Sequence, residues 1–375
     1  MAAVCFLVFG CKPDASGRRA ALESTSRPAS VPSREDALYP VDEYPSIQAA
    51  FDAAAEHGGT VVFGAKRYEI PATLSVSDVN VRVRGQGRAT ILVPAPRLPS
   101  IIDIGDPSKP RYPYSANEIS DLMFDFRGTD TVAIRWLRWG QIGVARNIHF
   151  MNPGESSVGI ATASNMDVNE LVFEGINWWH EASIKTGSPA RGVGLRINAN
   201  NCKVLNSTFI GARIAIDLAA DNALSAFSVT GCRFKQNGIA LRAGGGGRFG
   251  GFSANVSDSR FERNSQWDLE IAGTSTEHPW YGIFLRGLFF STSAGISLRN
   301  TDGVTLDTLT VKDVTQYTTS GRSVFIVDGS GASPSNLHVD VRNIIRAQGT
   351  TIERLVAPSL ADDRSRPGGS RGSQP

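Results

Sequence analysis

Between residues 119 and 345 the chain repeats one arrangement of apolar and polar positions. An apolar residue is followed by two variable residues, a small or apolar residue, one variable residue and a large apolar residue. Successive copies end 22 to 36 residues apart, and self-similarity at periods of about 20 to 50 residues is typical of solenoid proteins. The copies end at Phe124, Phe150, Phe173, Phe209, Phe234, Phe261, Phe289, Val311 and, in a weaker ninth copy, Ile344.

The segments between these copies are short alternating stretches broken by Asn, Gly, Asp and Ser, which predict strands and turns. Leucine-rich, ankyrin and tetratricopeptide signatures do not occur, and no strict six-residue period is found. The pattern therefore predicts an all-β chain that forms a single-stranded, right-handed parallel β-helix over residues 37–357. The longest spacing predicts a protruding loop at residues 177–192, NWWHEASIKTGSPARG.

A short amphipathic helix is predicted over residues 46–57, ahead of the first coil. Apolar residues recur there at the i, i+3, i+4 spacing, Ser46 can cap the start, and Gly58 can end the helix in a left-handed conformation. A solenoid leaves the core of its first coil exposed unless an atypical terminal unit covers it. We therefore expect this helix to be the N-terminal cap.

The stretch SIQAAFDAAAEHGGTVVFGAKRYEI, followed by VRVRGQGRATIL, resembles the pectate-lyase-like superfamily. The likeness is to members with the N-terminus of rhamnogalacturonases, epimerases and phage tailspikes, and it is sharp over about residues 44–93. The chain departs from the family pattern at Gly64 and Ala65, where a Pro-Pro-Gly type of turn is usual. The resemblance implies a pectin-lyase-like solenoid and carbohydrate, most often acidic polysaccharide, as the substrate class.

The motifs that would fix a reaction within this superfamily are missing. Asn300–Gly303 reads NTDG, as in polygalacturonase-type hydrolases, but the partner motifs of those enzymes do not follow. Asp302 alone cannot supply the two carboxylates that inverting hydrolysis requires, so a turn between strands is the favoured interpretation. The calcium motif of pectate lyases and the aspartate-rich signature of alginate epimerases are also absent. No metal or cofactor is predicted.

A column of charged residues is predicted on one outer face of the solenoid. In the strand after each copy, period-two alternation places the apolar residues Ile214, Ile216, Ile239 and Leu241 inside. The outward column then reads Arg196, Asp217, Arg242, Glu270 and Arg299. Opposite charges paired across a solvated sheet would explain this column. A strip that binds an anionic or hydroxyl-rich chain along the solenoid axis is the functional alternative.

The predicted loop at residues 177–192 concentrates groups that could bind or transform a sugar. Trp178 and Trp179 could stack on sugar rings or anchor the loop to the body, and His180, Glu181, Lys185 and Arg191 add titratable groups. Lys185 or Arg191 is the candidate base for a lyase. Glu181 with Asp217 is the candidate pair for a hydrolase, provided that the carboxylates lie about 6.5 to 9.5 Å apart.

The net charge and the terminal segments indicate which partners the protein has and where in the cell it is located. There are 38 basic and 36 acidic residues, a net charge of +2 that does not suggest a nucleic-acid binder. The opening MAAVCFLVFGC resembles the end of a lipoprotein signal with lipidation at Cys11, although basic residues do not precede it. We expect a leader and linker over residues 1–36, a disordered tail over 358–375, and contact with a membrane only through a lipid anchor.

Three functions remain open at this point. The chain could be a secreted or surface-tethered bacterial enzyme that cuts acidic polysaccharide, either a lyase or a hydrolase. It could be a noncatalytic β-helix that binds polysaccharide or a cell surface. It could also be a module like a phage tailspike, and the sequence does not indicate an oligomeric state.

If the leader is read correctly, cells that express the full upstream reading frame should produce a protein whose mature N-terminus is a lipid-modified Cys11. Mass spectrometry of the membrane-extracted protein measures this directly. An unprocessed, unmodified N-terminus in the soluble fraction would contradict export.

Overall fold

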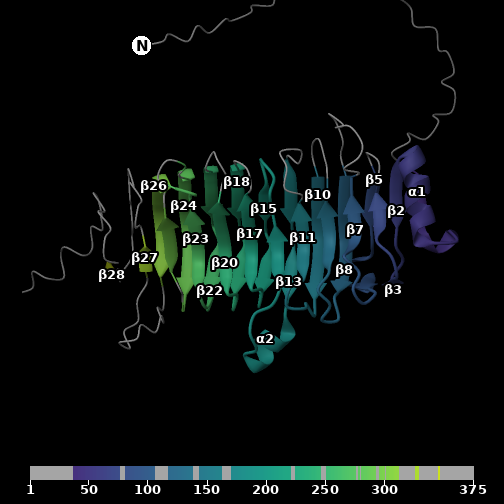
Figure 1. The fold of residues 1–375 in the computed structure, drawn as a ribbon, viewed down its shortest axis with the longest axis horizontal. Coiled ribbons are helices and arrows are strands. Elements are labelled where there is room, and N and C mark those ends of the chain that lie inside the picture. Colours follow the sequence, from purple (N-terminus) through teal and green to yellow (C-terminus); the bar gives the residue numbers. More distant parts are fainter. Residues whose placement is uncertain are drawn as a thin grey trace, which may run out of the picture.

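The computed structural model is one elongated stack of parallel strands (Figure 1). It describes residues 37–346 except 77–80, 106–116, 138–142, 163–169, 221–223, 246–250, 276–277, 279, 293–294, 300, 312–325 and 329–344. Cys11, the predicted leader and linker, the tail, Ile344 and residues 347–357 lie outside the described residues.

One sheet runs the length of the stack, and each of its strands pairs in parallel with the strand of the next coil. Within the described residues it has eleven strands. They are β4 (Leu74–Val76), β7 (Ser100–Ile104), β9 (Val132–Trp136), β11 (Val158–Thr162), β14 (Val193–Arg196), β17 (Ile214–Ala220), β20 (Ile239–Gly245), β23 (Trp267–Ala272), β25 (Ile296–Arg299), β27 (Ile326–Asp328) and β28 (Ile345–Arg346).

The second sheet consists of two parallel ladders that meet at a corner, and in some coils one long strand runs through that corner. In chain order, the strands of this sheet before helix α2 (Glu181–Thr186) are β1 (Leu38–Pro40), β2 (Gly59–Val62), β3 (Arg67–Ile70), β5 (Val81–Arg84), β6 (Ile91–Pro94), β8 (Asn117–Asp125), β10 (Gly143–Met151), β12 (Leu171–Glu174) and β13 (Asn177–Trp179). The strands after helix α2 are β15 (Lys203–Leu205), β16 (Thr208–Ile210), β18 (Leu224–Thr230), β19 (Arg233–Lys235), β21 (Gly251–Ser257), β22 (Arg260–Glu262), β24 (Trp280–Ser291) and β26 (Thr301–Val311).

Helix α1 (Ile47–His57) lies at the N-terminal end of the stack (Figure 1). Ser46 Oγ accepts a hydrogen bond from the Ala49 N–H at 3.1 Å, and the helix buries Phe51 edge-on against Phe63. Gly58 follows with the predicted positive φ of 73°, although its ψ of 165° is extended. The all-β, right-handed parallel β-helix with a short capping helix is therefore confirmed. Two 3₁₀ turns, η2 (Val41–Glu43) and η3 (Gly87–Ala89), complete the first coils.

A column of aromatic rings runs through the core, with one ring from each of seven successive coils. Phe209, Phe234, Phe261 and Phe290 are register partners whose ring centroids lie 5.0 to 5.5 Å apart, with their planes nearly parallel. The coils before them contribute Phe124, Phe150 and Trp178. Such offset stacks add about 0.5–1.5 kcal/mol per pair beyond the burial of apolar area.

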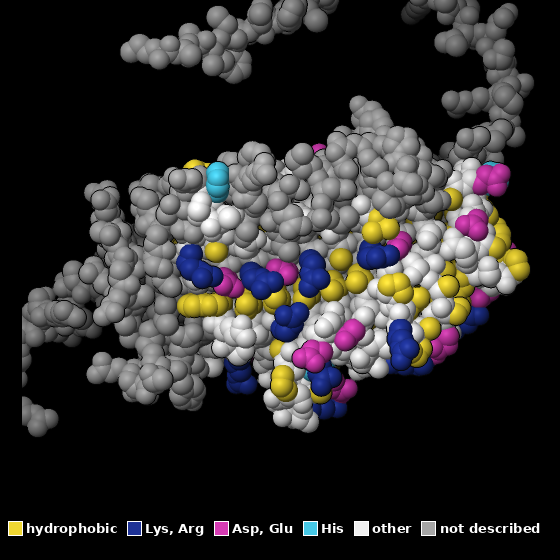
Figure 2. All heavy atoms as spheres, in the orientation of Figure 1, with side chains coloured by type: hydrophobic (Ala, Val, Ile, Leu, Met, Phe, Trp, Pro, Cys, Tyr) yellow, Lys and Arg dark blue, Asp and Glu magenta, His cyan; other side chains and the backbone are white. Residues whose placement is uncertain are grey.

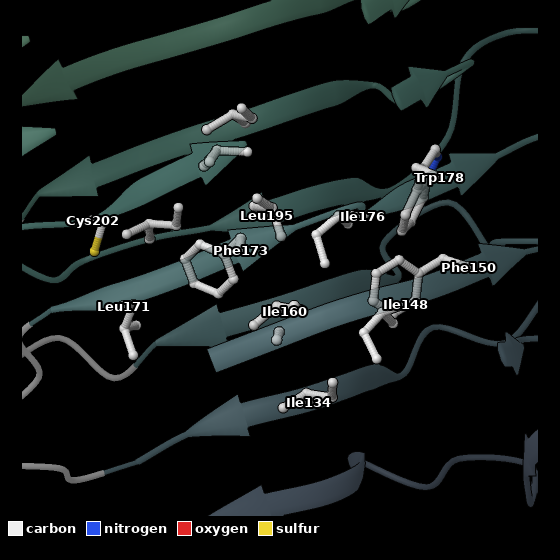
Figure 3. Close-up of a cluster of buried hydrophobic side chains, with 14 of the residues drawn as sticks. Ile134, Ile148, Phe150, Ile160, Leu171, Phe173, Ile176, Trp178, Leu195 and Cys202 are labelled. Atoms are coloured by element: carbon white, nitrogen blue, oxygen red, sulfur yellow. The ribbon is translucent and has the colours of Figure 1, made fainter. Parts of the chain in front are cut away.

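Two of the residues that end the sequence repeat lie outside this column. Phe173 pairs with Ala145 and Val204 on the other ladder, and Figure 3 shows it among Leu171, Leu195 and Cys202, apart from Phe150 and Trp178. In a later coil Phe290, not Phe289, joins the stack, because Phe289 is the partner of Arg260.

The corner before each ring is a residue in the left-handed conformation, three positions earlier in the chain. The column reads Asp121, Asn147, Gly175, Asn206, Gly231, Asp258 and Gly287, all with φ between 48° and 67°. These residue types accept that conformation at the lowest steric cost. Asx side chains and glycines largely alternate, since a Cβ added to Gly231 would lie 2.6 Å from Asn206 Oδ1, and one added to Gly287 would lie 2.6 Å from Asp258 Oδ1.

None of the helices that the structure describes has the length and apolarity needed to cross a membrane.

The aromatic column predicts where the solenoid is most sensitive to truncation. Phe234→Ala should lower the free energy of unfolding by about 3–5 kcal/mol, because it leaves a cavity between two stacked rings. Phe284→Ala is the control, since Phe284 lies on the outer surface with 48% exposure and its loss should cost less than about 1 kcal/mol. Urea unfolding followed by circular dichroism measures both. Equal losses in the two variants would contradict the role of the column.

Candidate functional site

The longest described connection between the two sheets contains helix α2 (Glu181–Thr186), which projects from the side of the solenoid (Figure 1). It begins directly after β13, where the His180 N–H donates to the Ile210 carbonyl at 3.1 Å. Gly187 ends it in a left-handed conformation, and the Arg191 N–H donates to the Gly211 carbonyl at 3.0 Å before β14 begins. The loop is thus fastened to the next coil at both of its ends.

The loop rests on Gly211. This residue has a φ of 73°, and a Cβ built on it would lie 2.8 Å from Cβ of Ser183 and 3.0 Å from Cβ of His180. Because such a separation is too short for two carbon atoms, only glycine allows helix α2 to lie this close to the body.

An open hollow of about 430 Å³ lies between the loop and the preceding coils. Four of the predicted site residues, His180, Glu181, Lys185 and Arg191, line it together. Sequence reasoning did not identify Gly128, Asn152 and Pro153, which come from earlier coils and form the other wall. We call this site the α2 hollow.

His180 is the buried titratable group of the α2 hollow. The residue is 5% exposed, and its Nδ1 has no hydrogen-bond partner among the described residues. Burial, and then the positive charge of Arg191, lower the pKa of His180 below its ordinary value, and a hydrogen bond to the Gly211 backbone opposes this in part. The neutral form of the imidazole is therefore favoured, with an unpartnered, buried Nδ1.

The charges around the α2 hollow do not cancel. Glu181 and Lys185 form an ion pair one helical turn apart. Arg191 makes no ion pair with a carboxylate in the described part of the chain, so the site keeps one uncompensated cation. An anionic ligand would supply the missing countercharge.

The two tryptophans beside the loop differ in their surroundings. Trp178 is 1% exposed and packs on Phe150 with ring centroids 5.9 Å apart, which is the anchoring alternative for this residue. Trp179 is 44% exposed on the outer surface. Alternation along β13 decides this, because one residue faces the core and the next faces solvent.

The charged column exists, and Figure 2 shows basic and acidic side chains alternating along the solenoid, with hydrophobic side chains in a line beside them. Arg242 donates to both carboxylate oxygens of Asp217 at 2.9 Å, and Arg196 Nε lies 3.8 Å from the same carboxylate. Arg299 donates to Glu270 at 2.7 Å. The column therefore forms ion pairs across coils.

The column differs from its prediction at both ends. Ser297, not Arg299, is the register partner of Glu270, and Arg299 reaches back from two positions further along β25. Towards the N-terminus the column continues to Arg135 and Asp103, where Arg135 Nε donates to Asp103 Oδ1 at 2.8 Å. The same alternation in β7 and β9 could have revealed this pair.

The hydrophobic line beside the column includes two residues that were predicted to lie inside. Ile214 and Ile239 form a separate cluster with Val158 and Val193 instead of joining the main core. Ala215 and Ile216 both belong to the main core, so strict alternation breaks between them and leaves Ile214 on the other face.

The structure does not bring the predicted hydrolase pair together in one hollow. Glu181 lines the α2 hollow, whereas Asp217 is 2% exposed with both oxygens held by Arg242. The described residues also contain no group of three or more His, Cys, Asp or Glu side chains placed to hold a metal ion.

Gly211→Ala should detach the α2 loop. The added methyl group collides with Ser183 and His180, and the left-handed backbone adds about 1–2 kcal/mol of strain. Limited trypsin digestion should then cleave after Lys185 or Arg191 several times faster than in the wild type. Gly187→Ala is the matched control, because it imposes the same backbone strain at φ 68° with no atom within 4 Å of the new Cβ. Equal digestion rates in the two variants would contradict the contact.

Neither a scan against protein-family models nor a search of curated proteins finds a match to this sequence. Solved structures do match in shape. The ORF18 protein of Geobacillus virus E2 has a TM-score of 0.53 and 14% identity, and the match covers 81% of this chain and 62% of the viral protein.

Two bacterial enzymes match with lower scores. The A-module of the Azotobacter vinelandii mannuronan C-5 epimerase AlgE6 has a TM-score of 0.41 at 13% identity, over 82% of this chain and 99% of the module. The family 28 exopolygalacturonase of Yersinia enterocolitica has a TM-score of 0.42 at 12% identity, over 82% of this chain and 78% of the enzyme. At these identities the likeness concerns the fold alone. The chain therefore shares the fold of the ORF18 protein, and its own strands show that this fold is a parallel β-helix.

Proposed function

We propose that this protein binds acidic polysaccharide at the α2 hollow. The observation that carries the proposal is the uncompensated cation of Arg191 in an open hollow that also holds Lys185 and the neutral, buried His180. A uronate carboxylate would pair with the guanidinium in a charge-assisted hydrogen bond. The sugar hydroxyls would meet the imidazole and the side chain of Asn152.

A long ligand fits this surface better than a small one. The α2 hollow is open rather than enclosed, and the exposed Trp179 directly precedes His180. The charged column and its hydrophobic line also run along the long axis of the solenoid (Figure 2). Together they offer alternating charge and apolar area to an extended chain.

Catalysis is the second candidate function, and His180 favours elimination over hydrolysis. An elimination needs one base near a neutralised carboxylate, and the α2 hollow offers His180, Lys185 and Arg191 for these two tasks. An inverting hydrolase needs two carboxylates, whereas the hollow is lined by the single carboxylate of Glu181 among the described residues.

The test is a binding panel of pectate, alginate and an acidic capsular polysaccharide, measured by calorimetry and affinity electrophoresis. The double variant Lys185→Gln/Arg191→Gln should bind at least tenfold more weakly, because each lost charge-assisted hydrogen bond contributes about 1.5–3 kcal/mol. Ultraviolet absorbance of unsaturated ends and an assay for reducing ends, applied to the same mixtures, separate a lyase, a hydrolase and a noncatalytic binder.

The control variant Arg82→Gln/Arg84→Gln removes the same charge from the N-terminal coils, on a different hollow of the surface. It should bind like the wild type. Unchanged binding in the α2 variant, or an equal loss in both variants, would refute the α2 hollow as the binding site.

We further propose that the protein is exported and tethered through Cys11, on the strength of its apolar leader alone. Export would place the binding surface where extracellular polysaccharide is met.

A further inference from the structure

A second hollow, of about 270 Å³, lies on the outer face of the ladder that carries Trp179. Register places its floor in two columns. Met123, His149, Asn177 and Thr208 are successive partners in β8, β10, β13 and β16, and Met151 is the partner of Trp179 beside them. We call this the Trp179 hollow.

The floor of the Trp179 hollow is apolar on one side and polar on the other. The exposed indole of Trp179 and the thioether of Met151 provide a flat apolar surface. Opposite them, Asn177 Nδ2 donates to the Gly175 carbonyl at 2.8 Å, which leaves its Oδ1 with no partner among the described residues. The hydroxyl of Thr208, in the same column, also makes no hydrogen bond within the described part of the protein.

Arg88 gives the Trp179 hollow its charge. Its Nε donates to His149 Nδ1 at 3.4 Å, and no described carboxylate forms an ion pair with its guanidinium. Burial, and then the charge of Arg88, lower the pKa of His149. The imidazole is therefore neutral, and its Nε2–H is left as a donor. The described residues that line the hollow include no Asp or Glu.

We propose that the Trp179 hollow binds one ring of a hexuronate. The apolar face of the ring stacks on Trp179 beside Met151, its hydroxyls meet Asn177 and Thr208, and its carboxylate pairs with Arg88. The volume suits one sugar ring, since pockets for larger, drug-sized ligands measure about 300–1,000 Å³. The inference extends the proposed function, because Trp179 and His180 are consecutive residues and a single polysaccharide chain could then occupy both hollows.

The test uses the full chain labelled with 5-fluorotryptophan and the monosaccharides sodium glucuronate and sodium galacturonate, with methyl glucoside as the uncharged counterpart. The chain has six tryptophans, and the spectrum of Trp179→Phe assigns the resonance of interest. That resonance should shift on titration with at least one uronate and respond more weakly to the glucoside. Arg88→Gln should lower the affinity for the uronate about three- to tenfold and leave the response to the glucoside unchanged. Arg88→Lys should restore part of the affinity for the uronate.

Two controls separate this inference from the proposed function. Arg82→Gln removes an exposed arginine from another hollow and should leave the titration unchanged. The double variant Lys185→Gln/Arg191→Gln should bind the polysaccharide more weakly, without changing the response of the Trp179 resonance to the monosaccharides.

The outcomes are therefore distinct. No shift of the Trp179 resonance up to the solubility limit of the uronates would overturn the subsite, even where the polysaccharide still binds at the α2 hollow. An equal response to uronate and glucoside, or an unchanged affinity in Arg88→Gln, would overturn the assignment of an acidic ring. A Trp179 response in a protein that binds no polysaccharide would support the subsite and count against the proposed function.

Discussion

Seven successive coils of the solenoid depend on one steric requirement, a left-handed residue at the same corner. Each such residue turns the chain so that the side chain three positions later enters the core. The rings then stack about 5 to 6 Å apart along the axis, close to the spacing of hydrogen-bonded strands. Backbone pairing and ring stacking therefore support the same register.

This fixed corner determines where extra residues can be accommodated. Between Trp178 and Phe209 the coil is longer than its neighbours, yet both rings remain in register. The additional residues lie between β13 and β14, where they form helix α2. The α2 hollow thus exists because the core positions are fixed while the connection between β13 and β14 can vary in length. Binding residues are commonly found on such loops of a rigid scaffold.

The fold could be predicted from sequence because the period and the capping helix are local patterns. Phe173 and Phe289 lie outside the column for one reason: the repeat pattern required a large apolar residue at its end but no Asn, Asp or Gly three positions before it. The added requirement selects Trp178 and Phe290 over Phe173 and Phe289. Neighbours in sequence, such as His180 and Lys185, could be expected near one another. The contribution of Asn152 depends on the offset between coils, which no local pattern encodes.

The alternation of Asx side chains and glycines at the corner gives the solenoid a longer unit than the single coil. An Asn or Asp carboxamide or carboxylate needs the empty space above a glycine in the next coil, as Asn206 does at Gly231. Where two Asx residues do meet, at Asp121 and Asn147, a 3.1 Å hydrogen bond from amide to carboxylate joins them. Growth of such a protein by gene duplication would therefore be least disruptive in steps of two coils. A recombinant solenoid of altered length should likewise gain or lose an even number of coils.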